Sequence, residues 1–165
     1  MIKKLILPAV LGTALFAACN SGSSDKGSAD STSKDTMTME MPDTAGVPPL
    51  PAIPAGAKVF FKAPKDGATV TSPVKLEFGQ ENIALAPKGE VKDSSGHHHV
   101  IVDGEGIPAG TVIPDDSTHF HYGKAQTEAS INLKPGKHTL ILQYGDGIHR
   151  SYGPALSDTL NITVK

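Results

Sequence analysis

The sequence predicts an all-β fold, an antiparallel immunoglobulin-like β-sandwich of about seven strands that occupies residues 58–165. Three observations support this. Short apolar or alternating runs recur along this part of the chain, turn signals separate them about every 8–20 residues, and the pattern contains no convincing amphipathic helix. An incompletely closed barrel is the alternative architecture, because it uses strands of the same length.

Each expected strand has its own signal. The run KVFFKAP opens the domain, and PKDGATVTSP, with Asp-Gly between two prolines, predicts a turn and a change of strand. Alternation in VKLEFGQ and LNITVK predicts half-buried strands, and the continuous apolar run HHHVIVDG predicts a central strand. The remaining strands are expected from TEASINL, which precedes the turn KPGK, and from HTLILQYGDG.

The N-terminus has the composition of a secretory signal. The positive residues of MIKK precede about 14 apolar residues, which is short for a transmembrane helix of about 20, and Ala17 and Ala18 stand just before Cys19. This arrangement is similar to the lipobox of bacterial lipoproteins. We therefore expect residues 1–18 to be a lipoprotein signal peptide and Cys19 to be lipidated. The protein would then be anchored to a membrane of the bacterial cell envelope, on the periplasmic or outer-membrane face. A plain secretory signal with a free cysteine is the alternative.

Residues 19–57 are expected to be a flexible tether that carries the lipidated cysteine. Their composition is rich in Ser, Thr, Asp and Pro, and few of them are able to enter a core. The run VPPLPAIPAG predicts a stiffer, polyproline-like end to this tether. Met37, Met39 and Met41 alternate in MTMEM, and thioethers select Cu(I), although chance in a low-complexity segment explains this run equally well.

Charge and motif content exclude several functions. Without Lys3 and Lys4 of the signal, 13 Lys and Arg residues face 17 Asp and Glu residues, a net charge of about −4. With no basic stripe, nucleic acid is not an expected partner. The single cysteine lies outside the domain, and the motifs of hydrolases, metalloproteases and nucleotide-binding enzymes are not present. The sequence therefore names no catalytic residue and gives no basis for assigning an enzyme.

The histidines are the main functional signal, since all seven lie between residues 97 and 149. Side chains two apart on a strand share a face, so His97 and His99 form one pair and His119 and His121 form another. Two such pairs on neighbouring strands are able to converge on one ion, and His149 is expected to add a ligand from a loop. Imidazole suits Zn and Cu among other metals, so a transition metal, Cu or Zn, is the expected cofactor.

Other residues are assigned supporting roles. His138 shares a face with Leu140 and Leu142, which favours a packed structural histidine. Four carboxylates are expected to orient the rings: Asp103, Asp115, Asp116 and Asp146.

Two alternatives to a metal-handling protein remain at this point. In the first, the histidines form a structural hydrogen-bond network in a non-enzymatic module that binds an envelope protein or a glycan. In the second, three histidines hold a metal with one open position, where it activates water. The sequence gives no substrate or general base for this last possibility.

The motifs together resemble a known family. The stretches FKAPKDGATVTSPVKLEFG, SGHHHVIVDG, THFHYGKAQTEASINLKPGKHTLILQYGD and LNITV are similar to the bacterial domain of unknown function DUF4399, over Val59 to Lys165. The resemblance implies an exported or lipid-anchored protein and leaves its chemistry unassigned. The positions that match the family's motif are His97, His98, His99, His119, His121, Gly123, Gln126, Thr127, Glu128, His138 and His149. Some family members have a further histidine after the last of these, whereas this chain continues Arg150–Ser151–Tyr152.

Overall fold

The computed structural model describes residues 46–165, so the expected signal peptide, Cys19 and the methionine run lie outside the described residues. This part of the chain confirms the predicted all-β sandwich. Its strands are β1 (Lys58–Ala63), β2 (Thr69–Val70), β3 (Val74–Glu81), β4 (Ala84–Leu85), β5 (Ser95–Val102), β6 (His119–Tyr122), β7 (Glu128–Ile131), β8 (Gly136–Gly145) and β9 (Ser157–Val164). One 3-10 turn, η1 (Gly153–Leu156), precedes β9. Within residues 46–165, no helix has the length and apolar character needed to cross a membrane.

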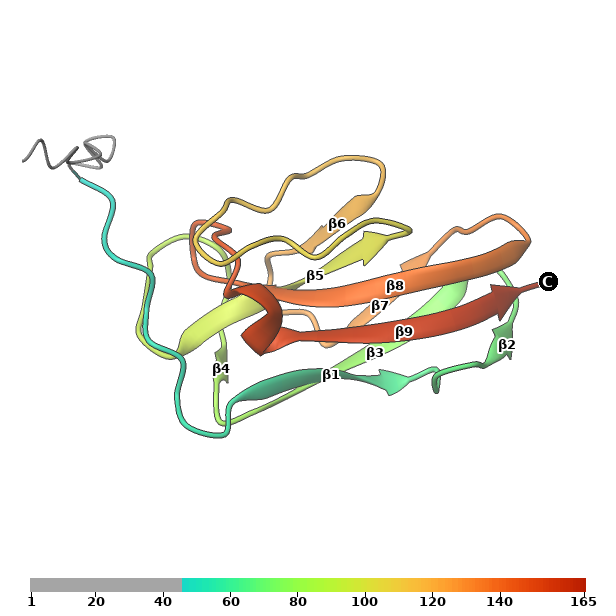
Figure 1. Cartoon of the computed structure of the whole chain (residues 1–165), viewed down its shortest axis with the longest axis horizontal. Helices are drawn as coiled ribbons and strands as arrows, with labels where there is room; N and C mark the ends of the chain where they lie inside the picture. Colours follow the sequence, from blue (N-terminus) through green and yellow to red (C-terminus); the bar gives the residue numbers. More distant parts are fainter. Residues whose placement is uncertain (1–45) are drawn as a thin grey trace, which may run out of the picture. The chain divides into compact units, whose positions relative to one another are not determined.

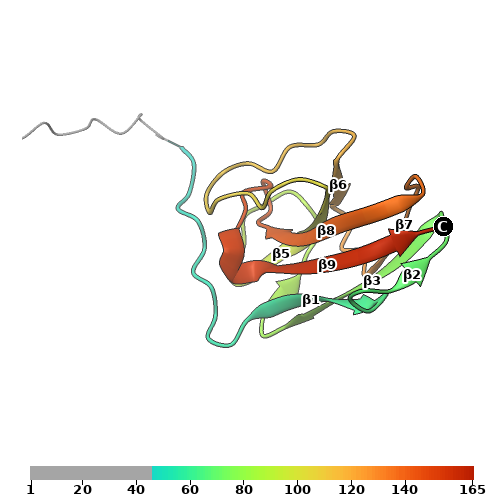
Figure 2. The same cartoon turned by 45° about the vertical axis from the view of Figure 1, so that its right-hand side comes forward.

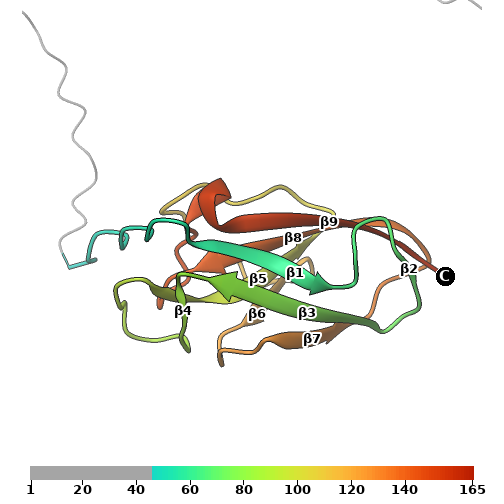
Figure 3. The ribbon, with the colours of Figure 1, turned by 90° about the horizontal axis from the view of Figure 1, so that it is seen from below.

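The strands form two sheets (Figures 1 and 2). One sheet has the order β1-β3-β7, and these strands lie side by side in Figure 3. The other has the order β2-β9-β8-β5-β4, with β6 pairing to β5 as well. The long pairs are antiparallel, as predicted, while the two-residue strands β2 and β4 join β9 and β5 in parallel. These two short strands account for most of the difference from the expected number of about seven.

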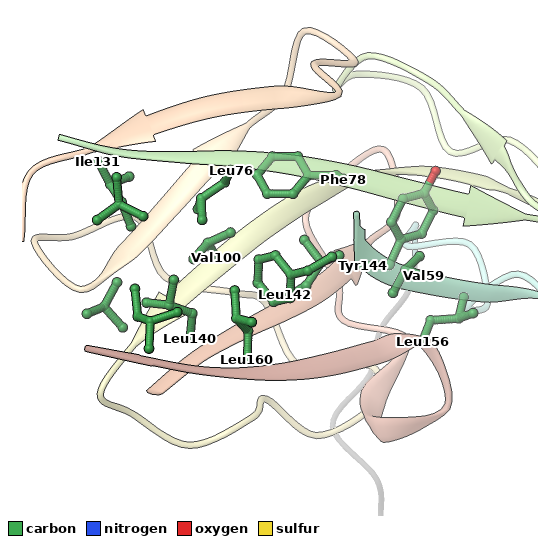
Figure 4. Close-up of a cluster of buried hydrophobic side chains, with 14 of the residues drawn as sticks. Val59, Leu76, Phe78, Val100, Ile131, Leu140, Leu142, Tyr144, Leu156 and Leu160 are labelled. Carbon is green, nitrogen blue, oxygen red and sulfur yellow. The ribbon is translucent and has the colours of Figure 1, made fainter. Parts of the chain in front are cut away.

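The core lies between the two sheets (Figure 4). Alternation in β3 directs Val74, Leu76 and Phe78 into it, as the sequence pattern predicts. The facing sheet contributes Val100 from β5 and the side chains of Leu140, Leu142 and Tyr144 from β8, among others. Because Leu76, Phe78, Val100 and Leu142 are at most 1% exposed, this apolar layer fixes the position of β5.

Both faces of β5 are buried, which the sequence pattern left undecided. His98, Val100 and Val102 face the core, and His97, His99 and Ile101 face the opposite way. The connection of residues 103–118 covers this second face (Figure 1). It is held there by hydrogen bonds such as Ile107 N–H to Gln143 Oε1 at 3.1 Å and Ile113 N–H to the His149 carbonyl at 2.9 Å.

The described chain begins before the expected start of the domain. Leu50 packs against the core, Pro51 is buried, and Asn82 Nδ2 donates to the Gly56 carbonyl at 3.0 Å. The residues 46–57 were expected to belong to the flexible tether, and the structure instead shows them in contact with the domain. Their prolines explain this, because a segment with fixed φ angles loses little conformational entropy when it docks.

Candidate metal centre

Three histidines meet on the outer face of the six-stranded sheet. In the antiparallel pairing of β5 and β6, His99 lies opposite His121, and His97 shares the face of His99. One ring nitrogen from each of the three lies within 4.8 Å of the others. His97 Nε2 and His121 Nε2 are 3.2 Å apart. The strand register therefore brings three potential ligands to one point.

A fourth histidine approaches from the turn that follows β8. The His149 ring lies 4.6 Å from the His121 ring and 5.2 Å from the His97 ring, measured between centroids. Its backbone has φ = +71°, a left-handed conformation that is uncommon for a residue other than glycine. We call His97, His99, His121 and His149 the histidine cluster.

Several ring nitrogens of the cluster are buried with no hydrogen-bond partner among residues 46–165. They are His97 Nδ1, His99 Nδ1, His99 Nε2 and His149 Nε2. More than about 90% of buried polar groups have a partner, and each exception calls for an explanation. Each neutral ring has one nitrogen with a lone pair, and a buried lone pair that no donor faces is suited to bind a cation.

Burial also keeps His97, His99 and His121 uncharged. The pKa of His97 is lowered to about 4, mainly by desolvation and next by the neighbouring His121. The pKa of His99 is lowered to about 2, mainly by desolvation and next by His97. The pKa of His121 is also lowered, mainly by desolvation and next by His149. These rings are neutral at pH 7, and a neutral imidazole is the form that ligates metals.

Two glycines leave space for the rings. A Cβ on Gly145, which pairs with His97, would lie 3.1 Å from His99 Nε2. A Cβ on Gly123 would overlap His121 Nε2. Sequence reasoning missed both roles, although a glycine inside a strand pattern is a known signal of close approach by another group.

The cluster faces a surface cavity of about 330 Å³. His99, His121 and His149 line it together with Ile113, and the charged residues Lys88 and Asp115 also contribute. This cavity gives an ion or a small ligand access to rings that are otherwise enclosed. Asp115, expected to orient a ring, therefore lies at the cavity of the site.

His119 lies outside the cluster, contrary to the expectation that both pairs converge. Its ring Nδ1 lies 2.9 Å from Asp116 Oδ1, and its strand partner is Ile101. The reason is the register. His99 pairs with His121 and Ile101 pairs with His119, so His97 and His119 lie on opposite sides of the His99–His121 pair along the strands.

The two remaining histidines have structural roles. His98 points into the core, where its ring lies 5.1 Å from the rings of both Phe78 and Tyr144. His138, as expected, is a structural residue, with Nδ1 2.7 Å from Asp103 Oδ2 and Nε2 2.9 Å from the Lys134 carbonyl oxygen. These two hydrogen bonds raise the pKa of His138, and the bond to the Lys134 carbonyl has the larger effect.

Asp146 supports the cluster through the backbone instead of through a ring. It is fully buried, and its carboxylate accepts hydrogen bonds from the backbone of the turn that carries His149 and from the Arg150 side chain. The sequence assigned no role to Arg150. Its spacing of four residues from Asp146 is the one signal that pointed to this pair.

Comparison with known proteins places the chain in a family. No curated protein and no solved structure matches it. The sequence model described as "Domain of unknown function (DUF4399)" matches residues 76–165, which contain the whole histidine cluster and every strand from β4 to β9. Because this match covers more than half of the chain, the protein belongs to the DUF4399 family.

Proposed function

We propose that this protein is a metal-binding lipoprotein of the bacterial cell envelope, whose histidine cluster holds one transition-metal ion, Zn(II) or copper. The observation that carries the proposal is the convergence of one ring nitrogen each from His97, His99 and His121 to within 4.8 Å, in a cluster where buried ring nitrogens lack partners in residues 46–165. Unpaired buried polar atoms cost about 1–3 kcal/mol each. A bound cation would satisfy one nitrogen of each ligating ring.

The spacing of the rings agrees with coordination. Two nitrogen ligands at about 2.05 Å from a tetrahedral metal lie about 3.3 Å apart, from the tetrahedral angle. His97 Nε2 and His121 Nε2 are 3.2 Å apart. In the metal-free protein this contact is a hydrogen bond from one neutral ring to the other. For both Nε2 atoms to bind an ion, the donating ring would take the tautomer with its proton on Nδ1.

The ligand type limits the metal. The cluster offers imidazole nitrogen, a ligand suited to zinc and copper among first-row ions, and it contains no thiolate. His97 and His99 lie on the central strand β5, paired on both sides, so two of the ligands are held rigidly. The cavity beside His99 and His121 supplies the route by which the ion arrives.

A purely structural hydrogen-bond network is less well supported. Such a network satisfies its members, whereas the cluster contains a single ring-to-ring hydrogen-bond contact within residues 46–165. His138 is an example of a structural histidine with both ring nitrogens paired, whereas the core residue His98 has an Nδ1 that is unpaired within the described chain.

The envelope location rests on the N-terminal signal and Cys19, which precede the described residues. Lipidation of Cys19 would place the domain at a membrane surface on a chain of several tens of residues. In the native bacterium, the wild-type protein should sediment with membranes, and a Cys19→Ser variant should appear in the soluble envelope fraction. An unchanged distribution would contradict lipid anchoring.

Metal binding is tested by elemental analysis and calorimetric titration. The chain from Asn20 onward, purified without chelator, should hold close to one equivalent of Zn or Cu. A His99→Ala variant should lose it. His119→Ala is the matched control, because this ring is bonded to Asp116 outside the cluster and the variant should keep the metal. Metal no higher than background, with no titration heat, would refute the proposed function.

A further inference from the structure

The turn that carries His149 is held by one carboxylate. Asp146 Oδ1 accepts from Ile148 N–H at 3.0 Å and from Arg150 N–H at 2.8 Å, and His149 N–H donates to the Asp146 carbonyl at 3.0 Å. The φ of +71° at His149 is costly for a residue with a side chain and persists only where its surroundings impose it. The direction of the His149 ring therefore depends on the position of the Asp146 carboxylate.

Arg150 in turn fixes that carboxylate. Its Nε donates to Asp146 Oδ2 at 2.8 Å, and a second guanidinium nitrogen lies 2.7 Å from the same oxygen. Asp146 is 0% exposed and Arg150 is 8% exposed. A buried carboxylate without its cation is strongly destabilising, so the pair acts as a unit.

The guanidinium has further donors, and these reach the segment before β1. They contact the carbonyl oxygens of Pro48 and Pro49, the second at 3.3 Å. Leu50 packs against the core and Pro51 is buried, so this segment is docked along the domain. We call residues 47–51 the proline segment. One arginine thus joins the proline segment to the turn of the histidine cluster.

We propose that Arg150 is a positioning residue for His149, and that it couples the docking of the proline segment to metal binding by the histidine cluster. The proposal rests on the metal-binding function above and deepens it. Arginine, the only one in the chain, is required because its planar fork contacts the carboxylate and both carbonyl groups at once. A lysine ammonium is a point charge that cannot make all of these contacts in one geometry. In a tethered protein, any event that pulls the proline segment away would then weaken the site.

The first test compares Arg150→Lys with wild type in the chain from Asn20 onward. Without metal, amide hydrogen exchange of Ile148, His149 and Arg150 should accelerate at least tenfold in the variant, while the amides of β8 and β9 keep their rates. The Zn(II) dissociation constant should rise about 10–100-fold, as for other groups that orient metal ligands. Lys58→Met, which removes a charge from an exposed pair with Glu81, is the matched control and should change neither quantity.

The second test examines the coupling. Replacing Pro48 and Pro49 by glycine keeps both carbonyl groups but loosens the free segment. This double variant should accelerate exchange of the same three amides and weaken Zn(II) binding several-fold. In an Arg150→Lys background the glycine substitutions should add no further effect, because the connection is already broken.

The outcomes separate the two proposals. If wild-type protein binds no metal, the metal-binding function is refuted, and the amide exchange rates still decide whether Arg150 holds the His149 turn. If wild-type protein binds metal, and Arg150→Lys has wild-type exchange rates and a dissociation constant within twofold, the positioning role is overturned. Additive effects of the glycine and lysine substitutions would overturn the coupling.

Discussion

Replacing His99 by leucine should stabilise the metal-free protein, although it removes a proposed ligand. His99 is 1% exposed, and neither of its ring nitrogens has a hydrogen-bond partner within the described chain. Each unpaired buried group costs about 1–3 kcal/mol, and leucine removes that cost. The different shape of the leucine side chain offsets up to about 1.5 kcal/mol of this stabilisation. With two such groups, the expected net effect is an increase of about 0.5–6 kcal/mol in the free energy of unfolding.

Urea denaturation with chelator present measures this change, and the melting temperature should rise by about 4 °C per kcal/mol for a domain of this size. His138→Leu is the control, because its ring makes two hydrogen bonds and the change should destabilise by about 1–3 kcal/mol. Zinc at about 100 times its dissociation constant should add about 2.7 kcal/mol to wild type and nothing to His99→Leu. A loss of more than about 1 kcal/mol in metal-free His99→Leu would refute the reasoning, because it would show that the ring contributes to stability without an ion.

Three further predictions follow from the same contacts. The metal-free domain should lose stability as the pH falls from about 6.5 to 4. Burial lowers the pKa of both His97 and His98 to about 4, so the unfolded chain binds protons at these residues before the folded chain does. Urea titrations at pH 7.5 and 4.5 measure this change, and equal stabilities at the two pH values would contradict it. Gly123→Ala should weaken Zn(II) binding at least tenfold in calorimetry, since the new methyl group displaces the His121 ring, and an unchanged dissociation constant would show that the ring lies elsewhere. His119→Ala should leave the dissociation constant within about threefold of wild type, and a larger loss would place this ring in the site after all.

The histidine face of β5 shows where sequence reasoning reached its limit. Alternation in THFHYG separated Phe120 and Tyr122 from the two histidines, and the structure agrees: Phe120 packs against the core and Tyr122 against Phe78. For β5 both faces contain apolar residues, so periodicity did not distinguish them. The loop of residues 103–118 decided the outcome by covering the outer face, and a covering loop leaves no periodic trace in the strand beneath it.

Strand periodicity, turn residues and motifs are local properties of the chain, so the all-β class, most of the strands, the concentration of histidine in one part of the domain and the family could be predicted without the structure. Which histidines meet depends on the pairing of strands and could not be predicted in this way. The pairing of β5 with β6 aligned His99 with His121 and left His119 beside Ile101. The turn at Asp146 brought His149 to the same point, and Arg150 tied that turn to residues far earlier in the chain. Register and long-range contacts depend on how separate segments pack against one another, and a histidine cluster made from three segments is therefore a property of the fold.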